Sequence, residues 1–175
     1  MAVLDKVVSI SELGQRKLWV IWGKSNSGKT WLSSTFPKPL LYVQIGDDGA
    51  NTIARQEGID AIRIKNIEEL KNLCEELQKN KKYSTVVFDT FSMVVNEWVD
   101  EKVISKNKKM TQQSWGDLKT EQEEIIKLTH KLASKRHVVL TCHESMDSIE
   151  GMEDEITPDV RPSVSKGART YLEGM

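Results

Sequence analysis

The chain has 175 residues, enough for one domain with its own hydrophobic core. Hydrophobic residues make up 38% of it and charged residues 29%, the composition of an ordinary globular protein rather than a fibrous or disordered one. The net charge of −1 excludes a global basic field for nucleic acid, and no apolar run is long enough to cross a membrane.

The first predicted strand, 17–22, leads directly into a glycine-rich loop that reads G-K-S-N-S-G-K-T. This pattern after a strand is typical of a phosphate-binding loop, because glycines let successive backbone N–H groups turn toward one anion. Lys29 would reach the β- and γ-phosphates and the Thr30 hydroxyl would ligate Mg²⁺. A chance glycine loop is the alternative, which the flanking strand and helix disfavour. The predicted nucleotide-binding residues are Gly23, Lys24, Ser25, Asn26, Ser27, Gly28, Lys29 and Thr30.

A helix over 30–36 is predicted next, ended by two prolines. The strand 40–45 is apolar on both faces, as a central parallel strand would be, and a turn over 46–49 ends it. A short strand at 61–64 precedes a helix that begins with Asn66 as its N-cap and has one apolar face. That face consists of Ile67, Leu70, Leu73, Cys74 and Leu77.

The second half starts with a buried strand over 84–89 and a helix over 91–104. A polar, basic loop at 105–113 leads to a capping box predicted at 114–117. A long helix follows, and the last clear strand, 137–142, ends in His143 and Glu144. The apolar residues of the long helix are Leu118, Ile125, Ile126, Leu132 and Ala133.

Strands that alternate with helices predict an α/β fold, a mostly parallel sheet with helices on both faces. We expect a single domain over 1–175, in which the tail 145–175 is either a hairpin or a mobile arm. The carboxyl ends of parallel strands meet at one edge, where ligands bind. The phosphate loop, the acids at 47–48, Asp89 and His143 all follow such ends.

Asp89 closes the strand pattern T-V-V-F-D and is the predicted second Mg²⁺ residue, opposite Thr30. It could instead only end its strand or cap the next helix. Thr90 follows it, so the acid that often stands beside such an aspartate is missing.

Hydrolysis also requires a group that orients or deprotonates water. Asp47 and Asp48 are the candidates, although adjacent acids are also common turn residues. His143 could touch the γ-phosphate or be an ordinary polar residue at a strand end, and Glu144 could serve the same site or face solvent.

The sequence contains two groups of basic residues. Such groups usually form solvated surface, and the alternative is that they contact phosphates. One group surrounds the loop after the helix over 91–104 and could bind a DNA backbone: Lys102, Lys106, Lys108 and Lys109. The other could supply a cationic finger to a neighbouring subunit's phosphate: Arg161, Lys166 and Arg169. Trp98 and Trp115 could stack on bases or lie in the core.

Cys74 and Cys142 lie far apart in the sequence, each in an apolar pattern. We expect core thiols rather than a disulfide, which suggests a reducing cytoplasm.

Over Lys17–Glu144 the chain resembles the RecA-like P-loop ATPases of bacteriophages, which include Sak-type single-strand annealing proteins and phage AAA-type nucleotide-binding proteins. The similarity rests on the phosphate loop and on the segments S-S-T-F-P-K-P-L-L-Y-V, T-V-V-F-D-T-F-S, S-W-G-D-L and V-V-L-T-C-H-E. Relatives extend beyond the position of Met175, so we expect that the natural chain could be longer.

The resemblance implies a RecA-like core, ATP with Mg²⁺, a homo-oligomer, and action on single-stranded DNA in recombination in the bacterial host cytoplasm. It implies that Asp89 is the Mg²⁺ acid and His143 a γ-phosphate sensor. It places Asp47 or Asp48 near the glutamate that primes water, with a side chain one methylene shorter. A nucleotide-dependent switch that binds ATP with little turnover is the alternative. A small-molecule kinase would need an arginine-rich lid, and a GTPase an N-K-x-D motif, and neither is visible.

Overall fold

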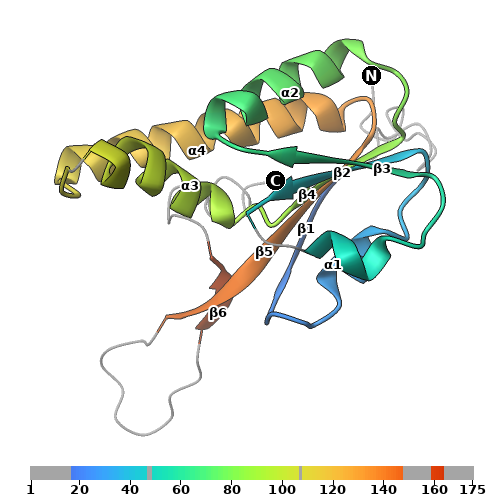
Figure 1. Cartoon of the computed structure of the whole chain (residues 1–175), viewed down its shortest axis with the longest axis horizontal. Coiled ribbons are helices and arrows are strands. Elements are labelled where there is room, and N and C mark those ends of the chain that lie inside the picture. The colour runs from blue at the N-terminus through green and yellow to red at the C-terminus, as the bar shows by residue number, and fades with distance from the viewer. Residues whose placement is uncertain (1–16, 47–48, 107, 148–158, 164–175) are drawn as a thin grey trace, which may run out of the picture.

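The computed structural model describes residues 17–46, 49–106, 108–147 and 159–163, and it confirms the predicted α/β fold. Five parallel strands form the sheet, and a sixth strand pairs antiparallel with the end of one of them (Figure 1). In spatial order the parallel strands are β1 (Leu18–Gly23), β5 (His137–Asp147), β4 (Thr85–Asp89), β2 (Leu40–Ile45) and β3 (Ile59–Ile64), and β6 (Asp159–Pro162) lies beside β5.

Helices cover both faces of this sheet (Figure 1). The chain crosses the sheet in one direction from β1 to β3 and returns from β3 to β5, so right-handed crossovers place the helices of the two halves on opposite faces. One face carries α1 (Lys29–Ser33) and the 3₁₀ helix η2 (Gly49–Ile53). The other carries α2 (Ile67–Lys79), α3 (Met93–Lys102) and α4 (Gln112–Ala133), with the 3₁₀ helix η3 (Ile104–Lys106) after α3.

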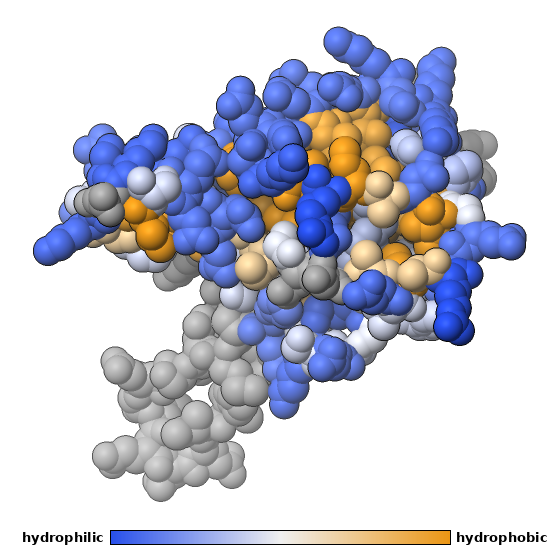
Figure 2. All heavy atoms as spheres, viewed as in Figure 1, coloured by the Kyte–Doolittle hydropathy of each residue, from blue (hydrophilic) through white to orange (hydrophobic). Residues whose placement is uncertain are grey.

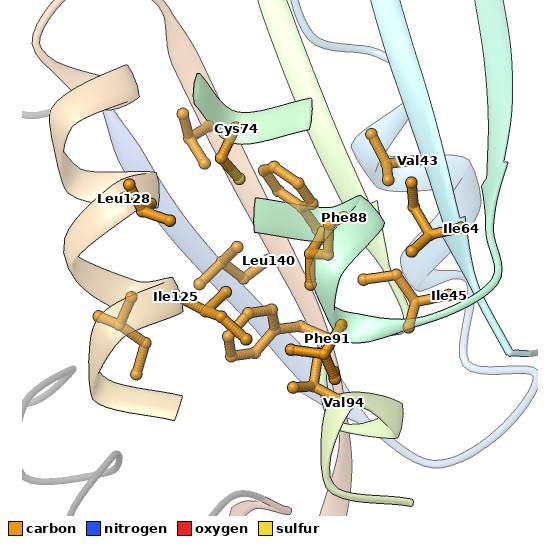
Figure 3. Packing of buried hydrophobic residues seen from close by; sticks show 14 of the residues in the cluster. Val43, Ile45, Ile64, Cys74, Phe88, Phe91, Val94, Ile125, Leu128 and Leu140 are labelled. Carbon is orange, nitrogen blue, oxygen red and sulfur yellow. The ribbon is translucent and has the colours of Figure 1, made fainter. Parts of the chain in front are cut away.

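The larger hydrophobic core lies between the sheet and α2, α3 and α4 (Figure 3). Phe88 on β4 and Phe91 after it are fully buried there and pack with the apolar side of the three helices. A smaller cluster on the opposite face lies under α1 and η2 and includes Tyr42 and Val139. The predicted central position of β2 is therefore correct, because it is buried along its whole length between β3 and β4.

The helix predicted over 30–36 is shorter than expected and ends at Ser33. The hydroxyls of Ser33, Ser34 and Thr35 each bond to the carbonyl three residues earlier, at 2.8, 2.6 and 2.7 Å. Such side chains offer the carbonyls a partner other than the next backbone N–H, and the following proline cannot continue the helix. The segment therefore closes in turns after α1.

The N-cap predicted for α2 is confirmed. The Asn66 side-chain oxygen accepts a hydrogen bond from the Glu69 backbone N–H at 2.8 Å. The predicted apolar face is buried at Ile67, Leu70, Cys74 and Leu77 and partly buried at Leu73.

The capping box predicted at 114–117 is wrong by one turn, because α4 begins at Gln112 with Thr111 as its cap. The Thr111 hydroxyl accepts from the Ser114 N–H at 3.1 Å, and the Ser114 hydroxyl accepts from the Thr111 N–H at 3.3 Å. The predicted apolar residues from Leu118 to Ala133 are buried as expected.

β1 and β4 differ by one residue from their predicted bounds, and larger differences occur in β3, β5 and α3. β3 begins at Ile59, and β5 continues to Asp147 because β6 pairs with its extension. α3 covers 93–102 rather than 91–104, and η3 follows where the predicted loop begins.

The surface over α2, α3 and α4 is mostly hydrophilic, with hydrophobic residues gathered beside α2 and β3 (Figure 2). No helix in the described part of the chain is long and apolar enough to cross a membrane. Cys74 and Cys142 are both free and buried, as expected for core thiols.

Candidate nucleotide-binding site

One edge of the sheet gathers the residues that the sequence singled out. Gly23 at the end of β1 is level with His143 on β5, and Asp89 ends β4 between β5 and β2. The loop after β1 leads to α1 on one face, whereas the chain after β4 leads to α3 on the other face. Strand ends whose connections diverge in this way leave a crevice, the usual ligand site of an open α/β sheet.

A cavity of about 560 Å³ occupies this edge, within the size range of small-molecule sites. The phosphate loop, α1, η2, the end of β4 and one residue of β5 line it. Its lining residues are Ser25, Asn26, Gly28, Lys29, Thr30, Trp31, Gly49, Asn51, Thr52, Asp89, Thr90 and His143.

The Lys29 side chain folds back toward the loop that precedes it. The lysine is buried, and its ammonium donates to the carbonyl oxygens of Gly23 at 2.9 Å and Lys24 at 2.7 Å. Because an ammonium group has three donors, one remains that can point into the cavity. Gly28 has a φ of 86°, a left-handed conformation that a side chain disfavours. This explains the second glycine of the motif.

Asp89 is the centre of a hydroxyl cluster at the back of the cavity. Its Oδ2 accepts hydrogen bonds from the Thr30 hydroxyl at 2.6 Å and the Tyr42 hydroxyl at 2.7 Å. Its Oδ1 accepts from Thr90 at 3.1 Å and from Thr141. The carboxylate is only 3% exposed, so these four donors offset the cost of burying its charge and fix its orientation.

Gly49 at the start of η2 lies directly against this cluster. A Cβ added to it would come within 2.9 Å of the Tyr42 hydroxyl and 3.2 Å of both Asp89 Oδ2 and Thr30 Oγ1. Only a residue without a side chain therefore fits here while the hydroxyl–carboxylate cluster keeps its geometry.

His143 lines the cavity, but it does not end its strand as expected, since β5 continues to Asp147. Its backbone N–H donates to the Ser92 hydroxyl at 3.1 Å, which joins β5 to the start of α3. Glu144 is not among the lining residues, because successive side chains of a strand point to opposite faces.

Several predicted residues lie outside the described part of the chain: Asp47, Asp48, Lys166 and Arg169. Arg161 lies on β6, paired in register with Ser145 on β5.

The basic residues of the first predicted group lie at the end of the molecule where α3 and η3 lead to α4 (Figure 1). Lys106, Lys108 and Lys109 are exposed, whereas Lys102 pairs with Glu101 at 2.5 Å. Trp115 on the first turn of α4 is exposed, and Trp98 is buried in the core.

Sequence reasoning missed the residues that support Asp89 and the tryptophan on α1 that lines the cavity. Tyr42 and Thr141 carry hydroxyls in otherwise apolar buried strands, a signal that could have identified them as partners of a buried acid. Trp31 follows the loop directly, but nothing in the sequence separates a pocket tryptophan from a core one. No group of three or more His, Cys, Asp or Glu side chains able to hold a metal occurs in the described ranges.

A family model described as an AAA domain matches residues 15–175. No curated protein matches the chain.

Proposed function

The chain belongs to this AAA domain family, and on that premise we propose that it binds ATP with Mg²⁺ at the edge cavity and hydrolyses it. The observation that carries the proposal is the 2.6 Å hydrogen bond from Thr30 to Asp89, beside the buried Lys29, in one cavity. The loop residues Gly23–Thr30 would surround the phosphates with backbone N–H groups.

The residues at the back of the cavity fit a magnesium ion. Mg²⁺ prefers oxygen ligands and is usually held by one or two carboxylates together with substrate phosphates. The Thr30 hydroxyl donates its hydrogen bond to Asp89, so its oxygen lone pairs stay available for a cation. Gly49 leaves this corner open, since a Cβ there would crowd both side chains. Bound Mg²⁺ would neutralise charge that develops on the phosphates.

Turnover requires groups on this chain that detect the γ-phosphate and position water. We assign the first task to His143, because it lines the cavity level with Gly23. Asp47 and Asp48 remain the candidates for priming water, since they directly precede Gly49 in the sequence. Glu144 is the weaker candidate because it does not line the cavity.

A finer proposal is that the protein acts on single-stranded DNA in phage recombination as a homo-oligomer. The resemblance to Sak-type proteins supports it, together with the exposed Trp115 and the exposed lysines before α4. A charged surface with an aromatic side chain suits a strand whose backbone is anionic and whose bases can stack. Arg161, Lys166 and Arg169 are the candidates for a finger that reaches a neighbouring subunit's phosphate.

A nucleotide-dependent switch with little turnover is the second candidate. It is favoured by the position after Asp89, where Thr90 takes the place of the acid that often activates water and donates to the carboxylate at 3.1 Å. Both candidates share the same nucleotide site, and they differ in whether ATP is cleaved.

The distinguishing experiment measures phosphate release from ATP with and without single-stranded DNA at low salt. The recombination proposal predicts turnover that DNA stimulates and that Lys29→Ala abolishes. The switch predicts ATP binding without turnover. Failure of single-stranded DNA to bind at low salt would exclude the DNA proposal, because binding to the phosphate backbone is strongest there.

A further inference from the structure

Among the described residues that line the cavity, Trp31 is the only large apolar side chain, and it is 55% exposed. The other lining residues are glycines or carry polar or charged groups. The phosphate loop and the Asp89 cluster account for most of them, but neither accounts for an indole beside Thr30. Exposed single tryptophans occur on many proteins, so exposure alone indicates no role for Trp31. Its place in the cavity lining does.

The orientation of α1 places Trp31 on the solvent side of the cavity. Lys29 and Ser33 are buried and lie one turn apart, so their side of α1 faces the sheet. Trp31 is two residues from each, which turns its side chain away from the sheet. An aromatic ring that points outward and still lines the cavity lies at its mouth.

The lining that η2 contributes to this cavity is polar. Asn51 and Thr52 on η2 are exposed and line the same cavity, and η2 packs against α1. A flat apolar face in a cavity that also holds amide and hydroxyl groups suits a flat heteroaromatic ring with polar edges. A nucleobase has this character, whereas the phosphates belong with Lys29 deeper in the loop.

We propose that the indole of Trp31 is the platform on which the base of a bound nucleoside triphosphate stacks. This inference rests on the proposed function, because it assumes that the triphosphate lies in the Gly23–Thr30 loop. Thr30 and Trp31 are adjacent, so one turn of α1 supplies both a metal ligand and the contact to the base. Trp31 is thus a residue that determines affinity for the base and takes no part in cleavage.

The test compares ATP with tripolyphosphate, which has the phosphate chain but neither base nor sugar. Affinities for both are measured in Mg²⁺ for the unaltered protein and for Trp31→Ala, Trp31→Phe, Trp19→Ala and Lys29→Ala. Losing a base–aromatic stack lowers affinity by about five- to 150-fold. Trp31→Ala should weaken ATP binding within that range and leave tripolyphosphate binding unchanged, while Trp31→Phe should retain most of the ATP affinity.

Trp19→Ala is the matched control, because Trp19 is exposed to 47% but is not among the residues that line the cavity. It should bind ATP as the unaltered protein does. Tryptophan fluorescence gives a second readout that a merely structural role would not produce. ATP should quench emission, tripolyphosphate should not, and Trp31→Phe should remove the quench while ATP still binds.

Equal ATP affinity in Trp31→Ala and the unaltered protein would overturn the inference, and so would an equal loss of affinity for ATP and tripolyphosphate. Either result leaves the proposed function standing as long as Lys29→Ala still weakens binding of both ligands by at least about tenfold. If the unaltered protein binds neither ligand, the proposed function fails and the inference fails with it.

Discussion

Gly49 is the residue at which the candidate metal site is most sensitive to a small change. Its Cα faces the hydroxyls of Thr30 and Tyr42 and the carboxylate of Asp89, which lie together at the back of the cavity. These contacts give the glycine a steric role that is independent of any special backbone angle.

We predict that Gly49→Ala lowers the affinity for ATP in Mg²⁺ by about tenfold or more, since hydrogen bonds to a charged group are among the stronger ones. The added methyl would approach the Tyr42 hydroxyl to 2.9 Å and force the Thr30–Asp89 pair to move. Titration calorimetry measures the effect.

Gly116→Ala is the control for that variant, because a Cβ at Gly116 on α4 meets no atom within 4 Å. It should leave ATP binding unchanged and stabilise the protein by about 0.5–1 kcal/mol, as alanine favours a helix more than glycine does. Equal ATP affinity in the two variants would contradict the role given to Gly49.

The buried thiols predict how stability changes in alkaline solution. Burial raises the pKa of both Cys74 and Cys142 from 9.0 to about 12. The folded state therefore keeps these protons while the unfolded chain loses them, and their contribution is present below pH 9 and falls as the pH rises toward 12. The loss is about 1.4 kcal/mol per pH unit for each thiol.

Urea denaturation between pH 8 and 10.5 checks this prediction against a double variant, Cys74→Ala with Cys142→Ala. The variant should be less stable at pH 8 because of the cavities it creates, but its stability should decline less steeply with pH. Parallel curves would show that the thiols do not cause the decline.

The position of Asp89 could be predicted from the sequence, but the hydroxyl groups that surround it could not. The position of Asp89 after four buried residues placed it at the sheet edge, whereas its bonds to Tyr42 and Thr141 depend on which strands become neighbours. Strand order is a long-range property that local pattern does not contain.

At the scale of elements, helix starts were predictable where one side chain could satisfy the first free N–H groups. At α2 only Asn66 is placed to do so, and its side-chain oxygen accepts from the Glu69 N–H. At α4 two hydroxyl residues, Thr111 and Ser114, stand three apart, and only the structure shows that the first is the cap and the second its partner. α1 was overestimated because its hydroxyl residues compete for the carbonyls.

We predict that Asn66→Ala destabilises the protein by about 1 kcal/mol, because the Glu69 N–H loses its partner. Asn72→Ala on the same helix is the matched control. Asn72 is exposed within α2, where alanine is the better helix former, so this variant should be neutral or slightly stabilising. Chemical denaturation compares them, and equal effects would show that the cap does not contribute.

At the scale of the whole molecule, the candidate nucleotide site and the candidate DNA surface belong to different elements. The cavity is built from α1, η2 and the strand ends, whereas the exposed lysines and Trp115 lie where η3 leads to α4 (Figure 1). The two sites can therefore be altered separately.

We predict that Lys108→Ala combined with Lys109→Ala weakens binding of single-stranded DNA at low salt and reduces its salt dependence, because fewer counterions are released. ATP affinity without DNA should stay the same. Fluorescence anisotropy with a labelled oligonucleotide measures the first effect. DNA binding that is unchanged, with the same salt slope, would place the DNA elsewhere.

The most direct test of the central claim is the affinity for ATP in Mg²⁺ of Lys29→Ala compared with the unaltered protein. Lys29 is held within the loop by two carbonyls, and its task is to meet the charge of the phosphates. We predict that the affinity of Lys29→Ala for ATP is at least about tenfold lower, while its melting temperature stays close to that of the unaltered protein. Unchanged affinity would contradict the account, because the loop would then not be the site that holds the triphosphate.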